Sequence, residues 1–312
     1  MGLVVVGPNS ARRCGSKTIA GRLLARVREA VRAPFGLGLC FVLCLATAEL
    51  AHAEPPRRIV SLDLCTDQLL IELAPRARIA AVTHLASDAS VSAIPDKAKG
   101  IPITHGDAED VLSYDPDLVL AGPFGVTSTV ALLRRLNRNV VIVPLPQDLA
   151  GVRASIIAVA AAIGEVAGGQ AMLQAFDQRL ASLRRPLDGA SPTALVYQVS
   201  GVVSASGSLA DATLAAAGFR NLARDYPLTR NGQLPLELLV ASPPDLLVLS
   251  SASNAYRTPA ADNLRHPALD ELRRRYASLE LPWQLWLCGT PHVADAIEKL
   301  TAARDRLKAA PR

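Results

Sequence analysis

The sequence lacks several of the features from which an activity is usually recognised. Only 4% of its 312 residues are aromatic, which is a small share for a protein that stacks against a large flat ring. No glycine-rich phosphate fingerprint follows the first expected strand of either half, because Asp63-Leu64 and Ser200-Gly201 occupy those turns. The sequence therefore lacks the motif that would best indicate a dinucleotide-dependent enzyme. No G-x-S-x-G motif occurs, and neither Cys65 nor Cys288 has an evident histidine partner motif, so a serine or cysteine hydrolase has no direct support.

Net charge is absent from most of the chain. The sequence carries 33 basic and 28 acidic residues, but seven of the basic and two of the acidic residues lie within residues 1–53. The remainder therefore holds 26 residues of each sign. A neutral body has no electrostatic footprint for DNA or RNA, so nucleic acid is not expected as a partner.

The sequence also has no apolar run long enough to cross a membrane comfortably. Its longest candidate, residues 35–48, has fourteen residues, whereas a spanning helix needs about 20. A basic segment precedes this run and Ala51-His52-Ala53 follows it, which is the order of a secretory signal peptide. We therefore expect residues 1–53 to be a signal peptide and the exported protein to begin at Glu54. An uncleaved anchor helix is the alternative.

Cysteine is scarce once this leader is set aside. Three of the five cysteines lie in residues 1–53, and only Cys65 and Cys288 remain in the exported chain. In an oxidising compartment they either pair or stay separate and buried, and the choice depends on a distance that the sequence does not supply.

One long amphipathic helix is predicted near the middle of the chain, within residues 164–186. Apolar residues recur there at steps of three and four, at Met172, Leu173, Phe176, Leu180 and Leu183, so they form one stripe that must be buried. At about 1.5 Å per residue the helix spans roughly 30 Å, about the diameter of a small domain. It can therefore bridge two lobes.

Similar segments flank this bridging helix. AEDVLSYDPDLVLAG precedes it and LELLVASPPDLLVLSS follows it, and the two align on Glu109 and Glu237. In both, a Pro-Asp pair lies seven and eight residues further on, followed by a run of Leu and Val. Each segment predicts a short helix, a Pro-Asp turn and a buried strand. The repetition indicates two similar lobes.

Strands and helices alternate along the chain, which predicts α/β lobes with parallel sheets covered on both faces. Strands are expected at residues 58–62, 79–83, 117–121, 140–143, 194–199, 245–249 and 283–287. Helices are expected at residues 67–73, 127–136, 209–217, 269–276 and 293–308, with another that Asp148 caps and that ends at Ile163. The predicted fold has two Rossmann-like lobes, residues 54–163 and 187–312, joined by a single long bridging helix.

The chain from Arg57 onward resembles the solute-binding proteins of ABC importers for cobalamin and iron complexes. The resemblance rests on RIVSLDLCTDQLLIELA, VTHLASD, the two Glu-to-Pro-Asp segments and HPAL. Gln68 and Leu64 stand where the family more often has glutamate and proline. The resemblance implies a periplasmic receptor that is not an enzyme. Such a receptor binds cobalamin, heme or a ferric siderophore between its lobes and delivers it to a permease dimer in the inner membrane. No resident cofactor and no metal site is implied.

The ligand would lie where the carboxyl edges of the two sheets face each other. Aromatic rings suit a corrin or porphyrin face, and arginine suits propionate or phosphate groups. Tyr197 and Trp283 are alternatively core residues, and His84 and His105 are alternatively ordinary loop residues. The candidate contacts are His84, Asp88, His105 and Phe124 from the first lobe, with Tyr197, Tyr256, Arg257, Trp283 and Trp286 from the second.

Two further expectations concern partners and alternatives. In the family, acidic residues at the positions of Glu109 and Glu237 meet basic residues of the permease. Alternatively, each glutamate only lies at the start of a helix, where the positive end of the helix dipole stabilises a carboxylate. A Zn or Mn receptor of the same architecture would use His84, His105 and Asp88, although these lack the close histidine spacing of a metal cluster. A secreted hydrolase is the alternative from another class.

Overall fold

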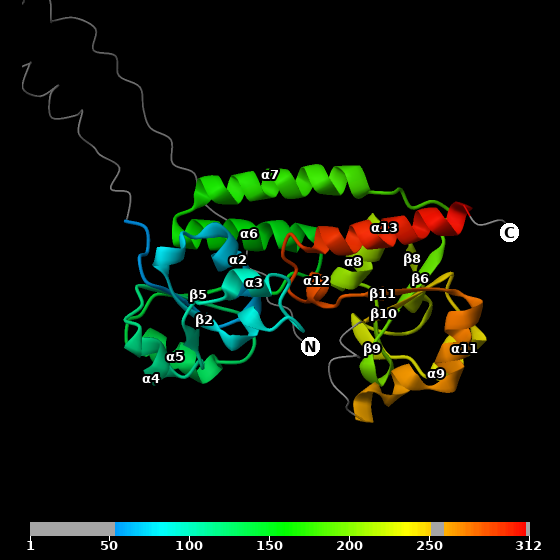
Figure 1. The fold of residues 1–312 in the computed structure, drawn as a ribbon, viewed down its shortest axis with the longest axis horizontal. Helices are drawn as coiled ribbons and strands as arrows, with labels where there is room; N and C mark the ends of the chain where they lie inside the picture. The colour runs from blue at the N-terminus through cyan, green and yellow to red at the C-terminus, as the bar shows by residue number, and fades with distance from the viewer. Residues whose placement is uncertain (1–53, 251–258, 310–312) are drawn as a thin grey trace, which may run out of the picture. The chain divides into compact units, whose positions relative to one another are not determined.

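The computed structural model describes residues 54–250 and 259–309, and these residues contain two β-sheets with helices around them (Figure 1). The first lobe has five strands: β1 (Ile59–Ser61), β2 (Ile79–Thr83), β3 (Ile103–Thr104), β4 (Leu118–Ala121) and β5 (Val140–Ile142). Its helices are α2 (Leu64–Leu73), α3 (Pro95–Ala98), α4 (Ala108–Ser113) and α5 (Thr127–Arg135). The strands are all parallel, in the order β3-β2-β1-β4-β5.

The second lobe contains a mixed sheet. Its strands are β6 (Thr193–Tyr197), β7 (Val202–Ser204), β8 (Arg220–Asn221), β9 (Asn231–Gln233), β10 (Leu246–Ser250) and β11 (Ala277–Leu281). Its helices are α8 (Leu209–Ala216), α9 (Leu236–Ala241), α11 (Pro267–Arg275), α12 (Gln284–Leu287) and α13 (Val293–Ala309). The pairs β10–β11, β10–β6 and β6–β8 are parallel, whereas β7 runs antiparallel to β6 and β9. The α/β class is confirmed, but the expectation of a fully parallel second sheet is wrong.

One expected strand is a helix instead. Residues 284–287 form α12 with Trp283 as its N-cap, and the strand at this edge of the sheet is β11, which ends at Leu281. Pro282 separates the two elements, and proline lacks the N–H that a strand needs to continue its ladder. The apolar character of Trp283 to Leu287 comes from packing of α12 against the core, not from a strand.

Two adjacent helices connect the lobes. α6 (Leu149–Ile163) begins at Asp148, whose carboxylate accepts a hydrogen bond from Gly151 N at 2.7 Å, as expected for its cap. Gly164 then ends α6 in the left-handed conformation with φ 75°, which glycine adopts without strain. The predicted bridging helix follows as α7 (Val166–Leu183), and Figure 1 shows it running alongside α6.

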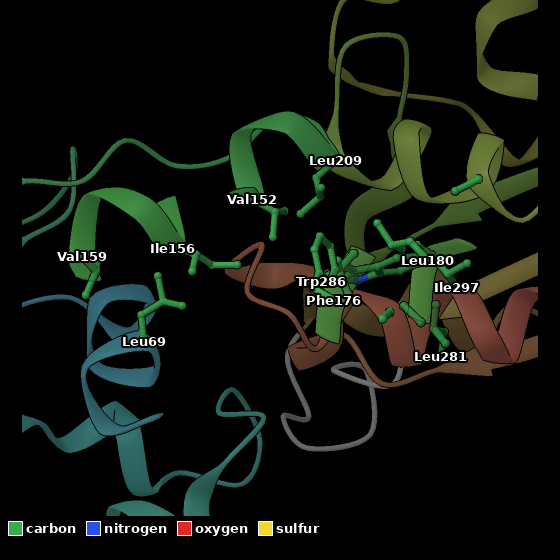
Figure 2. Close-up of a cluster of buried hydrophobic side chains, with 14 of the residues drawn as sticks. Leu69, Val152, Ile156, Val159, Phe176, Leu180, Leu209, Leu281, Trp286 and Ile297 are labelled. Carbon is green, nitrogen blue, oxygen red and sulfur yellow. The ribbon is translucent and has the colours of Figure 1, made fainter. Parts of the chain in front are cut away.

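A continuous hydrophobic core runs from the first lobe through α6 and α7 into the second. Figure 2 shows Val152, Ile156 and Val159 of α6 together with Leu69 of α2 and Leu209 of α8. Phe176 and Leu180 of α7 belong to the same core and are 3% and 7% exposed. Met172, Leu173 and Leu183 of the predicted stripe are partly buried and pack against this core. The stripe on the bridging helix therefore faces the core, and α6 connects the lobes as directly as α7 does.

The lobes are also joined covalently. Cys65 in α2 forms a disulfide with Cys288, which follows α12, and their Cα atoms are 4.8 Å apart. Of the two alternatives for these cysteines, the structure shows pairing. Within residues 54–250 and 259–309, no helix is long and apolar enough to cross a membrane.

Candidate functional site

Several candidate residues follow strands of the first sheet, at its carboxyl edge. His84 follows β2, His105 follows β3, and Phe124 lies shortly after β4. Both histidines are exposed, and the Phe124 side chain is 72% exposed. Because the carboxyl ends of parallel strands meet at one edge of a sheet, these side chains share that edge. An exposed ring of this size is available to a ligand.

Asp88 shapes the loop that follows β2. Its carboxylate accepts hydrogen bonds from Ser90 N at 2.8 Å and from Ser90 Oγ at 2.7 Å. These bonds lower the pKa of Asp88, because they favour the ionised carboxylate. Asp88 therefore carries a negative charge at this edge of the sheet. Its hydrogen bonds to Ser90 stabilise the turn in the loop.

A buried carboxyl lies behind the turn between β1 and α2. Asp67 is 0% exposed, and burial raises its pKa to about 8. Thr83 donates to this carboxyl from Oγ1 at 2.6 Å and from N at 3.2 Å. Next to it, Asp63 caps α2 by accepting from Cys65 N at 2.9 Å. Asp67 thus ties α2 to the end of β2, just before the loop that carries His84.

A pocket of about 180 Å³ lies between the lobes, and we call it the cleft pocket. Leu145, Pro146 and Gln147 line it from the segment after β5. From the second lobe it is lined by Gln198, Ser204, Ser208, Leu209, Ala210, Asn231, Trp283, Trp286 and Leu287. Its polar groups are amides and hydroxyls, and Gln198 Nε2 donates to Ser204 Oγ at 3.1 Å. Its chemistry is neutral hydrogen bonding beside indole surface.

The two tryptophans differ in their exposure. Trp286 is 8% exposed and belongs to the core, so only a small part of its ring faces the cleft pocket. Trp283 is half-buried and donates from Nε1 to Ser90 O, in the first lobe, at 3.2 Å. Trp283 is therefore at once a wall of the cleft pocket and a contact between the lobes.

A second pocket, of about 620 Å³, lies within the second lobe and includes Tyr197, Glu237 and His266 in its lining. Tyr197 is 1% exposed, and burial raises its pKa. Its ring is a core ring, which is one of the two alternatives that the sequence left open for it. Tyr256 and Arg257 lie outside the described residues.

The two repeated segments occupy equivalent places in the lobes. Glu109 lies in the first turn of α4 and Glu237 in the first turn of α9, and both are exposed. The aspartate of each Pro-Asp pair accepts hydrogen bonds at the start of a central strand. Asp117 accepts from Arg58 N at 2.9 Å, and Asp245 accepts from Thr193 N at 2.7 Å. The repetition in sequence is therefore also a repetition in structure.

Sequence reasoning missed most of the cleft pocket. Gln147, Gln198, Ser204 and Asn231 belong to no motif, and β7 and β9, which position Ser204 and Asn231, were not predicted. The available signal was position alone, because Gln198 lies at the carboxyl end of an expected strand, residues 194–199. In the part of the chain that the structure describes, no group of three His, Cys, Asp or Glu side chains is arranged to hold a metal ion.

Known proteins with similar sequences and structures share this two-lobed architecture. A cobalamin-binding protein of Halobacterium salinarum is 25% identical over 194 residues, which are 61% of this chain and 53% of that protein. The chain thus spans about half the length of the curated relatives it matches. The periplasmic heme-binding protein RhuT from Roseiflexus sp. RS-1, in apo form, superimposes with a TM-score of 0.67 at 23% identity, covering 80% of this chain and 98% of that one.

A second solved structure is the periplasmic heme-binding protein BhuT in complex with two hemes. It superimposes with a TM-score of 0.64 at 26% identity and covers 81% of this chain and 98% of that one. The sequence profile of the periplasmic binding protein family matches residues 59–273. These residues include the first sheet, the second sheet except β11, and the helices between them, so the chain belongs to the periplasmic binding protein family.

Proposed function

We propose that this protein is the substrate-binding component of an ABC importer, which captures cobalamin or an iron complex such as heme or a ferric siderophore. The observation that carries the proposal is the cleft pocket, formed by both lobes of a periplasmic binding protein fold. Relatives described as cobalamin-binding and heme-binding support the ligand class. The role is binding and delivery without catalysis.

The ligand extends beyond the cleft pocket. The cleft pocket has a volume of about 180 Å³, which is below the range of about 300 to 1,000 Å³ in which most ligand sites fall. A corrin or porphyrin would therefore also cover exposed groups at the rim of the first sheet. His84, Asp88, His105 and Phe124 are the proposed rim contacts, and Trp283 supplies apolar surface inside.

Titration tests the ligand class. We expect cyanocobalamin, hemin or a ferric siderophore to bind with micromolar or tighter affinity, which corresponds to about 8 kcal/mol. Phe124→Ala should weaken binding about tenfold, since about 1.4 kcal/mol of ring contact is lost. Leu132→Ala is the matched control, because Leu132 is a 44% exposed apolar residue on the outside of α5. If none of the three ligands binds while Zn²⁺ does, the metal-receptor alternative replaces this proposal.

Glu109 and Glu237 are the proposed contacts with the permease. Two carboxylates at equivalent points on two lobes can dock on a matching pair of cations, which speeds encounter and fixes orientation more than it adds affinity. Replacing both by alanine should abolish uptake and salt-sensitive permease binding while ligand affinity stays within about twofold. Glu280→Ala, at another exposed glutamate, should leave uptake unchanged. Loss of ligand binding in the double variant would assign these glutamates to the fold instead.

Export completes the proposed function. We propose that residues 1–53, which lie outside the described residues, are a signal peptide, and that residues 54–163, 164–186 and 187–312 are the first lobe, the bridge and the second lobe. The intact mass of the exported protein should correspond to a chain that begins at Glu54. A species that retains residues 35–48 in the membrane would contradict a released receptor.

A further inference from the structure

Away from α6 and α7, the described residues form a disulfide, a hydrogen bond and an ion pair between the lobes. They are the Cys65–Cys288 disulfide, the hydrogen bond from Trp283 to Ser90, and an ion pair between His292 and Glu72. In each, the residue of the first lobe comes from α2 or from the loop after β2. The residue of the second lobe comes from the segment between β11 and α13. This segment therefore carries the second-lobe side of all three of these contacts.

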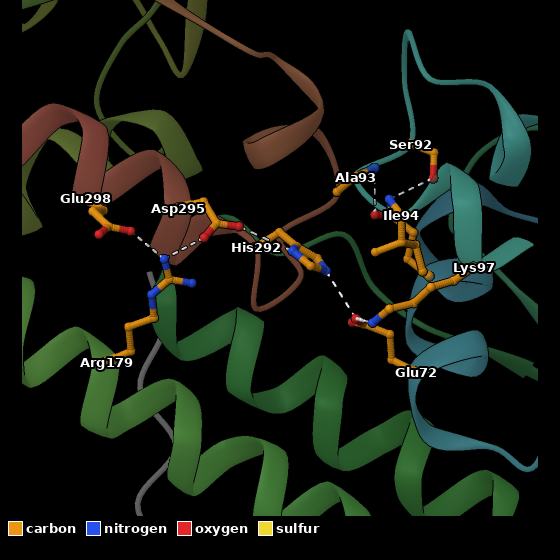
Figure 3. A network of polar contacts seen from close by, with 10 residues as sticks. Glu72, Ser92, Ala93, Ile94, Lys97, Arg179, His292, Asp295 and Glu298 are labelled. Carbon is orange, nitrogen blue, oxygen red and sulfur yellow. Dashed lines mark hydrogen bonds and ion pairs between the residues drawn. The ribbon is translucent and has the colours of Figure 1, made fainter.

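His292 lies between carboxylates of the two lobes, as Figure 3 shows. Its Nε2 atom is 3.3 Å from Glu72 Oε1 on α2, and its Nδ1 atom is 3.3 Å from Asp295 Oδ2 on α13. The side chains of His292 and Glu72 are 22% and 11% exposed. A neutral imidazole can donate from only one nitrogen, whereas a protonated one donates from both. Both contacts are therefore hydrogen bonds only when His292 carries the additional proton.

The surrounding charges extend this arrangement into a chain of alternating sign. Lys97 on α3 lies 2.8 Å from Glu72, and Arg179 on α7 lies 2.6 Å from both Asp295 and Glu298. These five side chains carry three negative and two positive charges. A proton on His292 makes the chain neutral and connects its first-lobe part with the part carried by α13 and α7.

Electrostatics gives the direction of the pH response. The hydrogen bond with Glu72 raises the pKa of His292, against the opposing effect of burial. The pKa of Glu72 is lowered, with its hydrogen bonds to His292 and Lys97 outweighing burial. The ion pair is thus fully present below about pH 6.5, the ordinary histidine pKa, and is lost as pH rises through the raised value.

We propose that His292 is a proton-operated clasp between the lobes, closed when the imidazole is protonated and released when it is neutral. A neutral imidazole keeps at most one of the two hydrogen bonds and loses its charge attraction to Glu72, so the contact between the start of α13 and α2 weakens. The disulfide limits the resulting movement, because Cys288 precedes His292 by only four residues and is bonded to the same helix, α2, that carries Glu72. The lobes then separate by a local rotation and the clasp can close again.

The two tryptophans of the sequence report on this contact without a ligand. Trp283 and Trp286 both lie in the segment between β11 and α13. Collisional quenching of their fluorescence by acrylamide measures how far solvent reaches them. In the oxidised protein, we expect the quenching constant to increase about twofold from about pH 5.5 to about pH 8.5, with one midpoint above about 6.5.

Variants distinguish the clasp from other causes of a pH-dependent change in quenching. His292→Gln should give a flat profile at the high-pH level, whereas His266→Gln, which alters the cap of α11, should keep the wild-type profile. Glu72→Gln should lower the midpoint, because the largest cause of the raised His292 pKa is then removed. A wild-type profile that is flat, a His292→Gln profile that still rises, or a Glu72→Gln midpoint that stays unchanged would overturn the clasp.

The limiting role of the disulfide can be tested separately. Replacing Cys65 and Cys288 together by serine should increase the pH-dependent change in quenching about twofold, since the released lobes then move further. Circular dichroism at both pH values establishes that this variant is folded. An unchanged amplitude in the folded variant would overturn the limiting role of the disulfide.

Discussion

At the scale of single residues, Asp67 makes folding stability depend on pH. Its pKa is about 8 in the folded protein and about 3.9 in an unfolded chain. The folded state therefore binds a proton that the unfolded state releases across this interval. The contribution of Asp67 to the free energy of unfolding should be largest below about pH 4, decrease as pH rises toward about 8, and then level off.

Asp67→Asn tests this dependence. The amide keeps an oxygen that accepts from Thr83 and adds N–H donors without a charge. We expect the variant to be more stable than the wild type at about pH 9 and the slope between about pH 4 and pH 8 to decrease, as measured by urea unfolding. Asp177→Asn, at an exposed acid on α7, is the matched control. An unchanged slope in Asp67→Asn would mean that the buried carboxyl does not set it.

Sequence reasoning at this scale succeeded where one residue has a local role. The cap at Asp148 depends on the next three residues only, and it is confirmed. The burial of Asp67 was not predictable, because acidic residues are almost never fully buried without a partner. The sequence placed Asp67 at the start of its helix. In the structure Asp63 caps the helix and Asp67 is one turn inside, facing Thr83.

At the scale of elements, two neighbouring glycines of α7 have opposite roles. A Cβ on Gly169 would overlap the Cβ of Ala160 on α6, whereas a Cβ on Gly168 would have nothing nearer than 4.0 Å. Gly169 thus allows α6 and α7 to approach closely, and Gly168 only weakens the helix. The sequence alone does not distinguish the two glycines, because the periodicity of one helix does not show which of its residues a partner helix approaches.

Matched substitutions distinguish the two glycines. Gly169→Ala should destabilise the protein by about 1 to 3 kcal/mol through overpacking. Gly168→Ala should stabilise it by up to about 1 kcal/mol, because alanine favours helix. Thermal unfolding of both variants checks the signs. Stabilisation by Gly169→Ala would show that α6 and α7 separate at little cost.

Strands inside apolar runs were predicted better than strands outside them, for a physical reason. β2 and β4 lie inside such runs and match the expected positions closely, and so do β1 and β5, which have only three residues each. β7 and β9 are equally short, but β7 stands between glycine and serine residues and β9 is the polar segment NGQ, so neither leaves a recognisable apolar pattern. The antiparallel part of the second sheet and the wall of the cleft pocket that it forms therefore could not be predicted.

At the scale of the whole molecule, the disulfide between the lobes should contribute strongly to stability. It closes a loop of 223 residues in sequence, and chain entropy gives an upper value of about 5 kcal/mol for such a loop. We expect reduction to lower the free energy of unfolding by about 2 to 5 kcal/mol and the melting temperature by roughly 10 °C. Calorimetry with and without reductant measures both, and the folded Cys65 and Cys288 double serine variant should match the reduced wild type. Equal melting temperatures with and without reductant would contradict the bond.

The two-lobed plan was predictable because the repeated segments and the bridging helix each leave a pattern in the sequence. How the lobes meet was not, since the meeting residues are far apart in the chain and share no motif. Glu72 and His292 are separated by 220 residues. Only the folded positions of α2 and α13 bring them together.

The same disulfide can form only late in the synthesis and folding of the chain. Cys65 lies near the start of residues 54–312 and Cys288 near the end, and this part of the chain has no other cysteine with which either could mispair. The bond cannot form until nearly all of the polypeptide has been synthesised and both sheets have brought their cysteines together. A chain that stops early carries an unpaired thiol at Cys65, so thiol-reactive reagents and cellular oxidases can tell an unfinished copy from a finished one.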